Sequence, residues 1–344
     1  MTKWFEDTDQ MHDVFVMNRL RLVRNVEGHI FPGRLSHEAR SEMLEFLEKK
    51  VLPLIAEDGQ PYTYCHLNEL EENNLNALYE RRIINHSRVE DQEPAGLALS
   101  PDESVSLVLN GEDHLRLQML SGSRSLENMW PALDRLDDEL GERVSYAFDR
   151  KYGYLTAFLT NVGTGLRASV VVHLPMLASG SQFRKLIQEY SRFGISIKGL
   201  SGDSSENYGN LYEVKNQKTL GQTEEELIGL VSQAAGQLAA QERKVKSLAL
   251  RSHRLQLEDE VYKSYGVLKY ARKLSYKEGM RYLSQLRLGL SENLIKLEKP
   301  VNLFGLMLNI RPANLQLNCG ETLEGDALDE ARAEYIRRNL PQTL

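Results

Sequence analysis

Arginines and carboxylates recur next to glycine-containing turns at a few places in this chain of 344 residues, and these side chains are the ones that could do chemistry. They occur in five segments, at 18–21, 110–116, 160–169, 198–203 and 204–207. Side chains alternate between the two faces of a strand, so Arg19 and Arg21 would point to the same side. Two guanidinium groups on one face suit a polyanion such as a nucleoside triphosphate, although such a pair is more often simply solvated.

Two of these segments have the composition of tight turns beside apolar strands. Residues 110–114, Asn-Gly-Glu-Asp-His, crowd polar groups into one bend, for which a surface hairpin is the commoner explanation. Residues 160–167 contain Gly163 and Gly165, whose backbone freedom would let several amides face phosphate oxygens. Neither turn by itself identifies a site.

The hydrophobic pattern predicts the elements that must position these side chains. Helices are expected at 36–57, 126–144, 182–193 and from 223 to about 248, the last opened by Thr223 and Glu226 at capping-box spacing. Strands are expected at 104–109, 115–120, 168–174, 195–200 and 211–214. Because strands and helices do not alternate cleanly, the first part is predicted to be α+β and not doubly wound. The pattern then becomes helical, so we predict domains at 1–250 and 251–344.

Composition excludes several classes of protein. The net charge of −7 argues against a nucleic-acid scaffold, which needs a basic surplus. No apolar run approaches the ~20 residues of a membrane span, and the polar N-terminus is unlike a signal peptide. Cys65 and Cys319 have no partner at metal-binding spacing, so we expect reduced thiols in a cytoplasmic protein. The chain has no Walker-type or dinucleotide-type glycine loop.

Taken together, the five segments resemble in order and spacing the guanidino kinases, the family of arginine kinase, creatine kinase and the bacterial protein arginine kinases. The bacterial branch is the most similar over nearly the whole chain, through the segments 161–169, 209–212, 216–221, 266–275 and 286–289. Free-guanidine kinases carry a helical domain before the Arg-x-Arg strand, for which the eighteen residues before Arg19 leave no room. The resemblance implies a catalytic domain with a mostly antiparallel sheet flanked by helices, followed by an α-helical C-terminal domain.

The resemblance also assigns roles to residues that match the family motifs. Glu112 and Asp203 would grip the substrate guanidinium, and one of them would act as base. Mg²⁺ would be held by phosphates and water, with no protein metal-ligand cluster. The positions expected to bind ATP are Arg19, Arg21, Arg82, Arg116, Arg167, Ala168, Ser169, Lys198, Gly199 and Gly202.

Several motif positions depart from the family pattern. Lys198 replaces an arginine and loses its bidentate fork, and Asp203 replaces a glutamate and is shorter by one methylene. Arg82 stands where the branch usually has a nucleotide-contacting histidine. Further departures are Gly111 for a glutamate and Phe158-Leu159 for Cys-Pro.

The family's phosphoarginine-binding motif, Arg-Asp-x-x-Arg-Ala, is only partly matched near the C-terminus. The corresponding segment is 328–333, Leu-Asp-Glu-Ala-Arg-Ala, which retains Asp329 and Arg332. The missing first arginine removes one phosphate partner, so regulation through this pocket is in question. An exposed helix pair is the competing interpretation of Asp329 and Arg332.

The function implied by the resemblance is ATP-dependent phosphorylation of arginine side chains in other proteins. In the family, such kinases mark proteins for a Clp-type protease in the stress response, work with an activator protein and form homodimers. The departures in the site leave an alternative open, a catalytically weak homologue that acts as a binding or adaptor module. A kinase for a free guanidino metabolite is a third interpretation.

Overall fold

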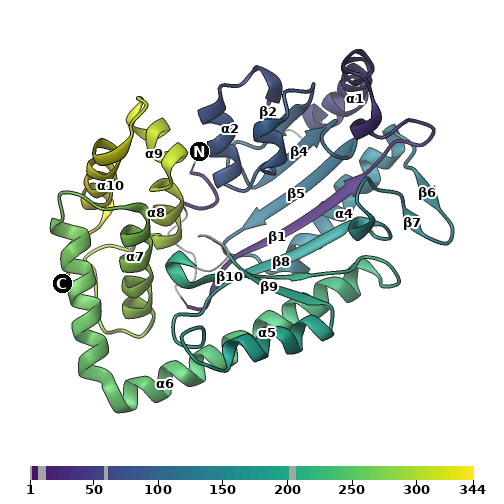
Figure 1. Cartoon of the computed structure of the whole chain (residues 1–344). Coiled ribbons are helices and arrows are strands. Elements are labelled where there is room, and N and C mark those ends of the chain that lie inside the picture. Colours follow the sequence, from purple (N-terminus) through teal and green to yellow (C-terminus); the bar gives the residue numbers. More distant parts are fainter. Residues whose placement is uncertain (1, 7–12, 58–60, 201–206) are drawn as a thin grey trace. The chain divides into compact units, whose positions relative to one another are not determined.

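The structure is a computed structural model that describes residues 2–6, 13–57, 61–200 and 207–344, with only the backbone at 56–57. In these residues the strands form an eight-stranded sheet, in the order β2-β3-β4-β5-β1-β8-β10-β9, and a two-stranded sheet, β6-β7 (Figure 1). The strands are β1 Phe15–Arg24, β2 Thr63–His66, β3 Gly96–Leu99, β4 Val105–Leu109, β5 Leu115–Ser121, β6 Phe148–Asp149, β7 Gly153–Tyr154, β8 Leu166–His173, β9 Ile195–Gly199 and β10 Leu211–Asn216.

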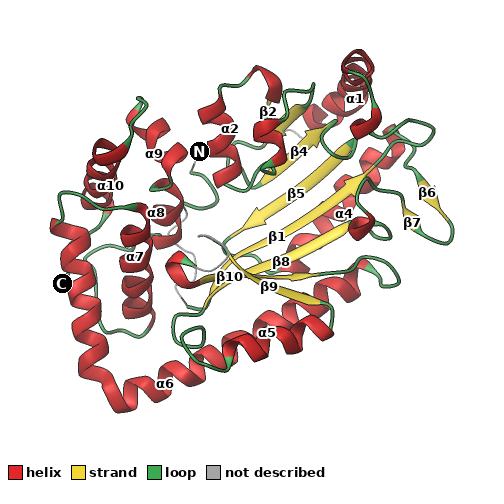
Figure 2. Ribbon diagram, viewed as in Figure 1, coloured by secondary structure: helices red, strands yellow, loops and turns green. Residues whose placement is uncertain are grey.

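Helices connect many of the strands and dominate the C-terminal part, as Figure 2 shows. They are α1 His37–Glu57, α2 Glu72–Glu80, α3 Ser87–Glu90, α4 Leu126–Arg143, α5 Phe183–Arg192, α6 Glu224–Tyr270, α7 Tyr276–Ser291, α8 Leu303–Asn309, α9 Pro312–Cys319 and α10 Gly325–Asn339. Short 3₁₀ turns occur at Pro32–Arg34, Leu67–Glu69, Leu159–Asn161 and Tyr208–Asn210. The predicted α+β class with an antiparallel sheet and a helical C-terminal part is confirmed.

The chain divides into two compact units, and each is described by itself. The first unit comprises residues 1–4, 18–169 and 215–232, and the second comprises 5–17, 170–214 and 233–344. The backbone of α6 is interrupted at His253, where φ is −137° and ψ is 31°. The domain boundary at residue 250 stays a prediction.

In the first unit, β1 lies antiparallel to β5. Strand β5 pairs with β4 on its other side, and β4 pairs with β3. Along β1 the side chains alternate: Leu20 and Leu22 are fully buried, whereas Arg19 and Arg21 are half-buried. Helix α4 contacts β5 and α1, and its N-terminus is capped by the Ser125 side chain, which accepts a hydrogen bond from the Asn128 amide. The apolar face of α4 repeats at helical spacing and is buried at Leu126, Met129, Leu133 and Leu140.

A smaller apolar cluster links α2 and α3 to strands β3 and β4. Leu75 and Leu78 of α2, Val89 of α3 and Val108 of β4 belong to it. In the sheet Val108 is opposite Arg116, so this cluster and Arg116 lie on the same face. The segment between α2 and α3 is therefore held beside the arginines of the sheet.

In the second unit, α7 begins with a capping box in which Ser275 and Glu278 satisfy each other's backbone amides. Helix α7 contacts α8 and α10, and α9 contacts α8 and α10. The core of this unit includes Leu283, Phe304 and Ile336, each 1% exposed or less.

The predicted elements from 36–57 onward correspond to α1, β4, β5, α4, β8, α5, β9, β10 and α6, with ends shifted by a few residues. The helix predicted to end near 248 runs to the interruption at His253, and a second helical stretch of α6 continues from there to Tyr270. Strands β2 and β3 were not predicted, because each has only four residues and shows too little alternation to identify it. Helices α2 and α3, of nine and four residues, were not predicted either.

Candidate functional site

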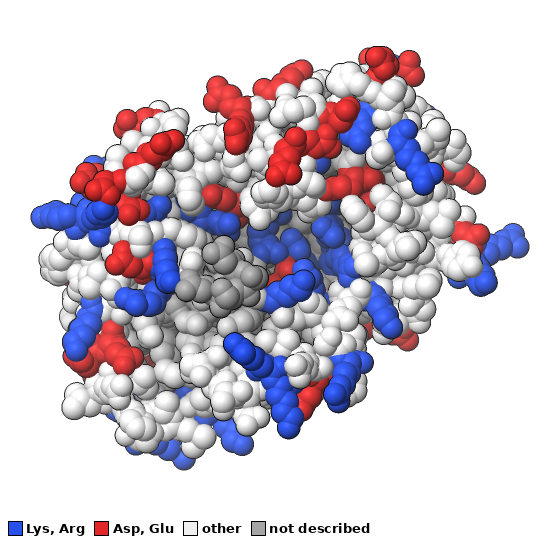
Figure 3. Space-filling model, viewed as in Figure 1, with Lys and Arg blue, Asp and Glu red and all other residues white. Residues whose placement is uncertain are grey.

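Three of the predicted ATP-binding arginines share one face of the sheet in the first unit. Arg21 of β1 lies opposite Gln118 of β5, and Arg116 is two residues from Gln118 on the same strand. Because directly opposed residues and their i±2 neighbours point to one side, Arg19, Arg21 and Arg116 lie on a common face. Lysine and arginine side chains also gather over the middle of the sheet on the face shown in Figure 3, although the whole chain is acidic.

Arg116 is the most buried of these arginines, with 4% of its surface exposed. One guanidinium nitrogen donates to the carbonyl of Ile83, and Nε is buried with no hydrogen-bond partner. Burial lowers the pKa of Arg116 to about 9, and the charges of Arg21 and Arg19 act in the same direction, against the favourable charge of Glu112. A guanidinium that is desolvated and surrounded by like charges gains stability from a bound anion, so this cluster suits phosphate.

The Glu112 carboxylate lies among hydrogen-bond donors next to this cluster. Asn85 Nδ2 donates to Glu112 Oε1 over 3.0 Å, and the Ser87 hydroxyl donates to the same oxygen. Burial acts to raise the pKa of Glu112, but these hydrogen bonds and the charge of Arg116 outweigh it, so the pKa is lowered. Glu112 is therefore ionised near neutral pH and can hold a cationic guanidinium.

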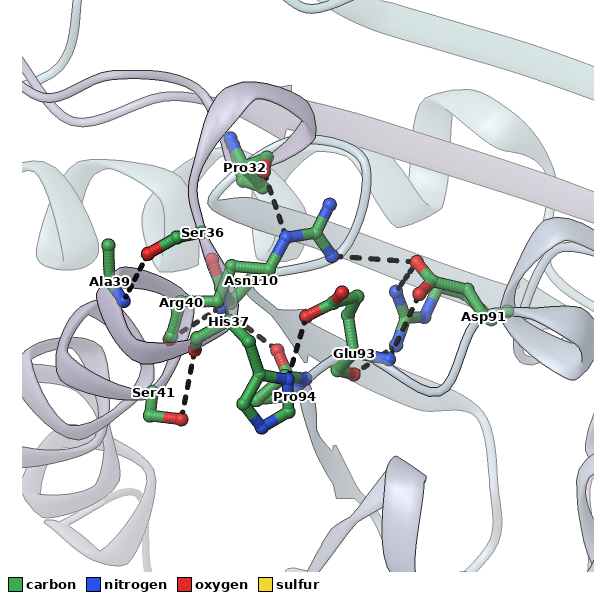
Figure 4. A network of polar contacts seen from close by, with 11 residues as sticks. Pro32, Ser36, His37, Ala39, Arg40, Ser41, Asp91, Glu93, Pro94 and Asn110 are labelled. Atoms are coloured by element: carbon green, nitrogen blue, oxygen red, sulfur yellow. Dashed lines mark hydrogen bonds and ion pairs between the residues drawn. The ribbon is translucent and has the colours of Figure 1, made fainter.

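The turn that carries Glu112 is fixed by its neighbours. Asn110 has a positive φ of 57°, and its buried amide donates to the carbonyls of Arg40 and Pro94, each over 2.9 Å. Figure 4 shows Asn110 between these two residues. Asparagine tolerates the left-handed conformation better than most side chains, so Asn110 makes the bend that directs Glu112.

Asp113 and His114, which follow in the motif, are structural. Asp113 Oδ1 accepts from Asn25 Nδ2 and from the Ala157 amide, each over 2.6 Å. His114 is fully buried, and its Nδ1 accepts from the Val26 amide over 3.1 Å. These bonds join the 110–114 turn to the end of β1 and to the 155–165 loop.

Arg167 uses its guanidinium to hold two loops together. It donates to Asn161 Oδ1 over 3.0 Å, to the Asn216 carbonyl over 2.6 Å and to the Thr160 carbonyl over 2.8 Å. The neighbouring Ala168 amide donates to Asn216 Oδ1 over 2.9 Å, and Ser169 Oγ is buried with no hydrogen-bond partner. Arg167 thus shapes the loop predicted to face ATP, and its contact with a phosphate stays a prediction.

The backbone of Arg82 has a positive φ of 67°, which is unusual for a residue other than glycine. Its carbonyl accepts a hydrogen bond from Gln118 Nε2 over 2.8 Å, and Gln118 lies opposite Arg21. This bond ties the 81–86 segment to the arginine face. The role of Arg82 toward nucleotide is untested.

A second network anchors the same segment from its other end. Arg40 of α1 and Arg88 of α3 both pair with Asp91, and Arg40 Nε also donates to the Pro32 carbonyl over 2.9 Å (Figure 4). Arg88 is almost completely buried and donates to the Glu93 carbonyl over 2.9 Å. These charge-assisted bonds hold the 85–94 segment against α1.

The remaining predicted site residues lie in the second unit or outside the described residues. Lys198 and Gly199 are exposed at the end of β9. Gly202 and Asp203 lie outside the described residues. The ATP-binding and catalytic roles of these four residues stay predictions.

The two residues predicted to bind phosphoarginine, Asp329 and Arg332, lie about one turn apart in α10. Arg332 is 1% exposed, donates to the carbonyls of Ile310 and Leu274 over 3.0 and 2.9 Å, and pairs with Asp329. These contacts give Arg332 a structural role in joining α10 to neighbouring segments, and exclude the exposed helix pair considered from the sequence. Binding of phosphoarginine at this position stays a prediction.

Sequence reasoning missed Asn85 and Ser87, the two donors to Glu112. They stand between the buried residues Ile84 and Val89 in a segment without a recognisable motif. Their polar character is no signal either, because all four residues at 85–88, Asn-His-Ser-Arg, are polar.

Among the described residues, no three histidine, cysteine or acidic side chains are grouped so as to hold a metal ion. Nor does that part of the chain contain a helix with the length and apolar character needed to span a bilayer.

Known proteins resemble this chain over both parts. Residues 43–245 match the family model described as "ATP:guanido phosphotransferase, C-terminal catalytic domain", and residues 254–343 match "Protein-arginine kinase McsB C-terminal domain". The protein-arginine kinase of Halothermothrix orenii is 36% identical over 341 residues, covering 99% of this chain and 97% of that protein. The protein-arginine kinase of Bacillus pumilus is 35% identical over 340 residues, covering 99% and 93%.

Solved structures of other kinases share the fold. Lombricine kinase matches with a TM-score of 0.58 at 19% identity, covering 72% of each chain. A duplicated taurocyamine kinase from Schistosoma mansoni, with bound transition-state-analogue components, matches with a TM-score of 0.62 at 22% identity. That match covers 81% of this chain and 41% of the other.

Proposed function

This chain belongs to the protein-arginine kinases of the ATP:guanido phosphotransferase family, and we propose that Glu112 and the arginines of β1 and β5 are its catalytic centre. The reaction is the transfer of a phosphoryl group from ATP to an arginine side chain. A bond forms between a guanidinium nitrogen and the γ-phosphorus, the bond from that phosphorus to the β,γ-bridging oxygen breaks, and the guanidinium loses a proton.

The observation that carries this assignment is the pairing of a buried cationic cluster with an ionised carboxylate. Arg116 is desolvated beside Arg21 and Arg19, and Glu112 lies close enough to Arg116 that each shifts the pKa of the other. Phosphoryl transfer needs positioning and charge neutralisation more than covalent assistance. The cluster would neutralise the ATP phosphates while Glu112 holds the cationic acceptor in line.

Glu112 is better suited to orienting the guanidinium than to acting as a strong base. Its pKa is held below the ordinary value for glutamate, whereas a guanidinium is protonated to above pH ~12. Proton loss is therefore expected to accompany formation of the nitrogen–phosphorus bond, which makes the nitrogen less basic. Asp203 is proposed as the second carboxylate, on the family motif alone.

Two buried polar groups of the proposed site fit a nucleoside triphosphate. The unpartnered Nε of Arg116 and the unpartnered Oγ of Ser169 are buried polar groups that a phosphate oxygen could satisfy. Mg²⁺ is proposed to accompany ATP as part of the substrate, and it would be held mainly by the phosphates and by water. Its chemistry would be to neutralise charge on the phosphates during transfer.

We also propose that the chain acts as a homodimer. Beyond the interruption at His253, α6 exposes Leu255 and Tyr262, seven residues apart, and Tyr270 eight residues further on. This spacing places the three side chains along one stripe of a helix. Exposed apolar residues that recur along one helix stripe are typical of helix–helix association, for which a second copy of α6 is the proposed partner.

The cellular role is proposed from the family. Arginine phosphorylation would mark client proteins for a Clp-type protease in the stress response, in the cytoplasm and with an activator protein. A free guanidino metabolite is the less favoured acceptor, because the full-length relatives are named as kinases of protein arginine.

The direct test is incubation with ATP labelled at the γ-phosphate and a mixture of unfolded proteins. Acid-labile label on arginine side chains is expected, and Glu112→Gln should abolish it while ATP still binds. Binding of ATP and protein without any transfer, by the wild type, would instead favour the adaptor alternative. Labelling of free arginine at a higher rate than protein would favour the metabolite kinase.

A further inference from the structure

Asn85 contacts both Arg21 of the arginine cluster and Glu112, the carboxylate proposed to hold the substrate guanidinium. Its Oδ1 accepts a hydrogen bond from Arg21 Nη1 over 3.3 Å, and its Nδ2 donates to Glu112 Oε1 over 3.0 Å. The opposite orientation of the amide would set NH₂ against a guanidinium and oxygen against a carboxylate, two repulsive contacts. The chemistry of the two neighbours therefore fixes which end of Asn85 faces which charge.

Ser87, the first residue of α3, supports the same carboxylate from a second direction. Its hydroxyl donates to Glu112 Oε1, the oxygen that Asn85 also contacts. The two donors act on one oxygen of the carboxylate, and Oε2 is the oxygen that they do not take. Their combined effect is to fix the rotation of the carboxylate plane.

We propose that Asn85 and Ser87 are positioning residues that orient Glu112 for the acceptor guanidinium, and that Asn85 couples this orientation to nucleotide binding at Arg21. This inference rests on the proposed catalytic roles of Arg21 and Glu112. It assigns to the segment between α2 and α3 a function that no motif in the sequence indicates.

The coupling has a physical basis in the length of the Arg21–Asn85 bond. At 3.3 Å this hydrogen bond is slightly longer than the usual range, so it restrains Asn85 only weakly. A phosphate that fixes the Arg21 guanidinium would also fix its contact with Asn85, and through it the Glu112 carboxylate. The acceptor would then bind to a carboxylate that is already ordered, which appears as positive cooperativity between ATP and acceptor.

The anchoring of the segment favours this interpretation. Its two ends are fixed to the sheet and to α1, through the Gln118 bond to the Arg82 carbonyl and the Arg40–Asp91 pair. Asn85 therefore sits on a supported backbone, and its side chain can transmit a restraint. In a purely structural role, the Asn85 bonds would only hold the segment in place, and their loss would lower stability without affecting cooperativity.

The test compares the wild type with Asn85→Ala, Asn85→Asp, Ser87→Ala and Ser87→Thr. Asn85→Asp retains an acceptor for Arg21 but sets a second anion against Glu112, whereas Asn85→Ala removes both contacts. Ser87→Thr retains the hydroxyl and should rescue the loss caused by Ser87→Ala. Gln256→Ala and Ser104→Ala are matched controls, because they remove an amide–carboxylate and a hydroxyl–carboxylate bond elsewhere.

The first measurement is the affinity for an arginine-containing peptide, by calorimetry, with and without an ATP analogue that has an imido bridge between the β and γ phosphates. In the wild type the analogue should increase peptide affinity about fivefold or more, the lower end of typical coupling between sites. Asn85→Ala should reduce this factor to near one, with affinity for the analogue alone within about twofold of the wild type. A coupling factor unchanged in Asn85→Ala would overturn the inference.

The second measurement is the pH profile of kcat/KM, whose acidic limb reports the free enzyme. Among the described residues, charged groups that act on Glu112 include Arg116, Arg88 and Asp113, and these remain in every variant. Asn85→Asp should move the acidic limb to higher pH and lower kcat/KM at pH 7 about tenfold or more, since a hydrogen bond to a charged group is lost. If the acidic limb of kcat/KM lay at the same pH in Asn85→Asp, in Ser87→Ala and in the wild type, the proposed positioning of Glu112 would be contradicted.

The two measurements separate this inference from the proposed function. If the wild type transfers phosphate to arginine but all variants match the controls, the kinase assignment stands and the positioning role is wrong. If the wild type binds both ligands cooperatively without transfer, and Asn85→Ala abolishes the cooperativity, the coupling stands and the kinase assignment fails.

Discussion

Arg24 and Asp137 form a buried ion pair, with 2.6 Å between Arg24 Nη2 and Asp137 Oδ2, that joins β1 to α4 in the first unit. Arg24 also donates to the carbonyl of Thr164 over 2.8 Å, and its guanidinium lies 3.6 Å from the centre of the Tyr154 ring. A single side chain thus joins the strand of Arg19 and Arg21 to a helix and to the loop that precedes Arg167.

Removal of one partner from this pair should destabilise the protein strongly. Asp137→Ala leaves the Arg24 charge buried without its counter-ion, and the free energy of unfolding should fall by about 3–5 kcal/mol. Denaturant titration of the wild type and the variant measures this difference. Lys263→Ala, which breaks an exposed i,i+4 pair with Asp259, is the control and should leave stability nearly unchanged, because solvent screens exposed pairs. Equal effects of the two substitutions would contradict the structural role of Arg24.

Arg116→Met should weaken ATP binding while preserving the fold. The substitution replaces a buried cation with an apolar side chain of similar length, which removes a phosphate partner and the like-charge repulsion with Arg21 and Arg19. Affinity for ATP measured by calorimetry should fall about tenfold or more, because a charge-assisted contact is lost. An unchanged melting temperature together with unchanged affinity would exclude Arg116 from the nucleotide site.

The reach of Asp203 should limit turnover. The family motif has a glutamate at this position, so Asp203→Glu restores one methylene and should raise kcat if the chain around it has not adapted to the shorter side chain. Asp203→Asn should abolish activity because the charge is lost. Steady-state kinetics with an arginine peptide measures both. A fall in kcat for Asp203→Glu, with unchanged ATP affinity, would indicate a site built around the aspartate.

Stability should decrease on acidification through His114. Burial lowers the pKa of His114 to about 4, whereas an unfolded histidine titrates near 6.5. The neutral ring is favoured by folding, so its contribution is complete above pH ~6.5 and is lost as the pH falls toward ~4, with a span of about 3 kcal/mol. Buried His173, whose pKa is also lowered by burial, contributes in the same direction.

The free energy of unfolding of His114→Leu, measured between pH 7 and pH 4, should fall less steeply than that of the wild type. At pH 7 its absolute value should be lower than that of the wild type, because the Val26 amide loses its acceptor. Parallel curves for the two proteins would contradict the assignment of this pH dependence to His114.

The exposed stripe of α6 should govern dimerisation. Leu255→Glu places a charge on that stripe, and light scattering should show a shift from dimer to monomer at micromolar concentration. Leu317→Glu, at an exposed apolar residue of α9, is the control and should leave the mass unchanged. A wild type that is monomeric at all concentrations would refute the homodimer itself.

The family and most of the long elements of this protein can be predicted from its residues alone. Arg-x-Arg, the 110–116 turn and the 160–169 loop combine into a pattern whose specificity comes from their order and spacing, which do not depend on the three-dimensional arrangement. Long helices such as α1 and α4 bury repeated apolar positions, and this periodicity is visible in the chain. The departures at Lys198 and Asp203 are likewise evident from residue identity alone.

The surroundings of these motif residues, in contrast, depend on how the chain packs in three dimensions. Asn85 and Glu112 are separated by 27 positions, and Arg21 and Asn85 by 64, so no local pattern could indicate that they form one chain of hydrogen bonds. Arg332 was predicted to bind a phosphoryl group, yet its burial and its carbonyl partners are consequences of helix packing. Desolvation and the sum of nearby charges set the pKa of Arg116, and both depend on how distant segments meet.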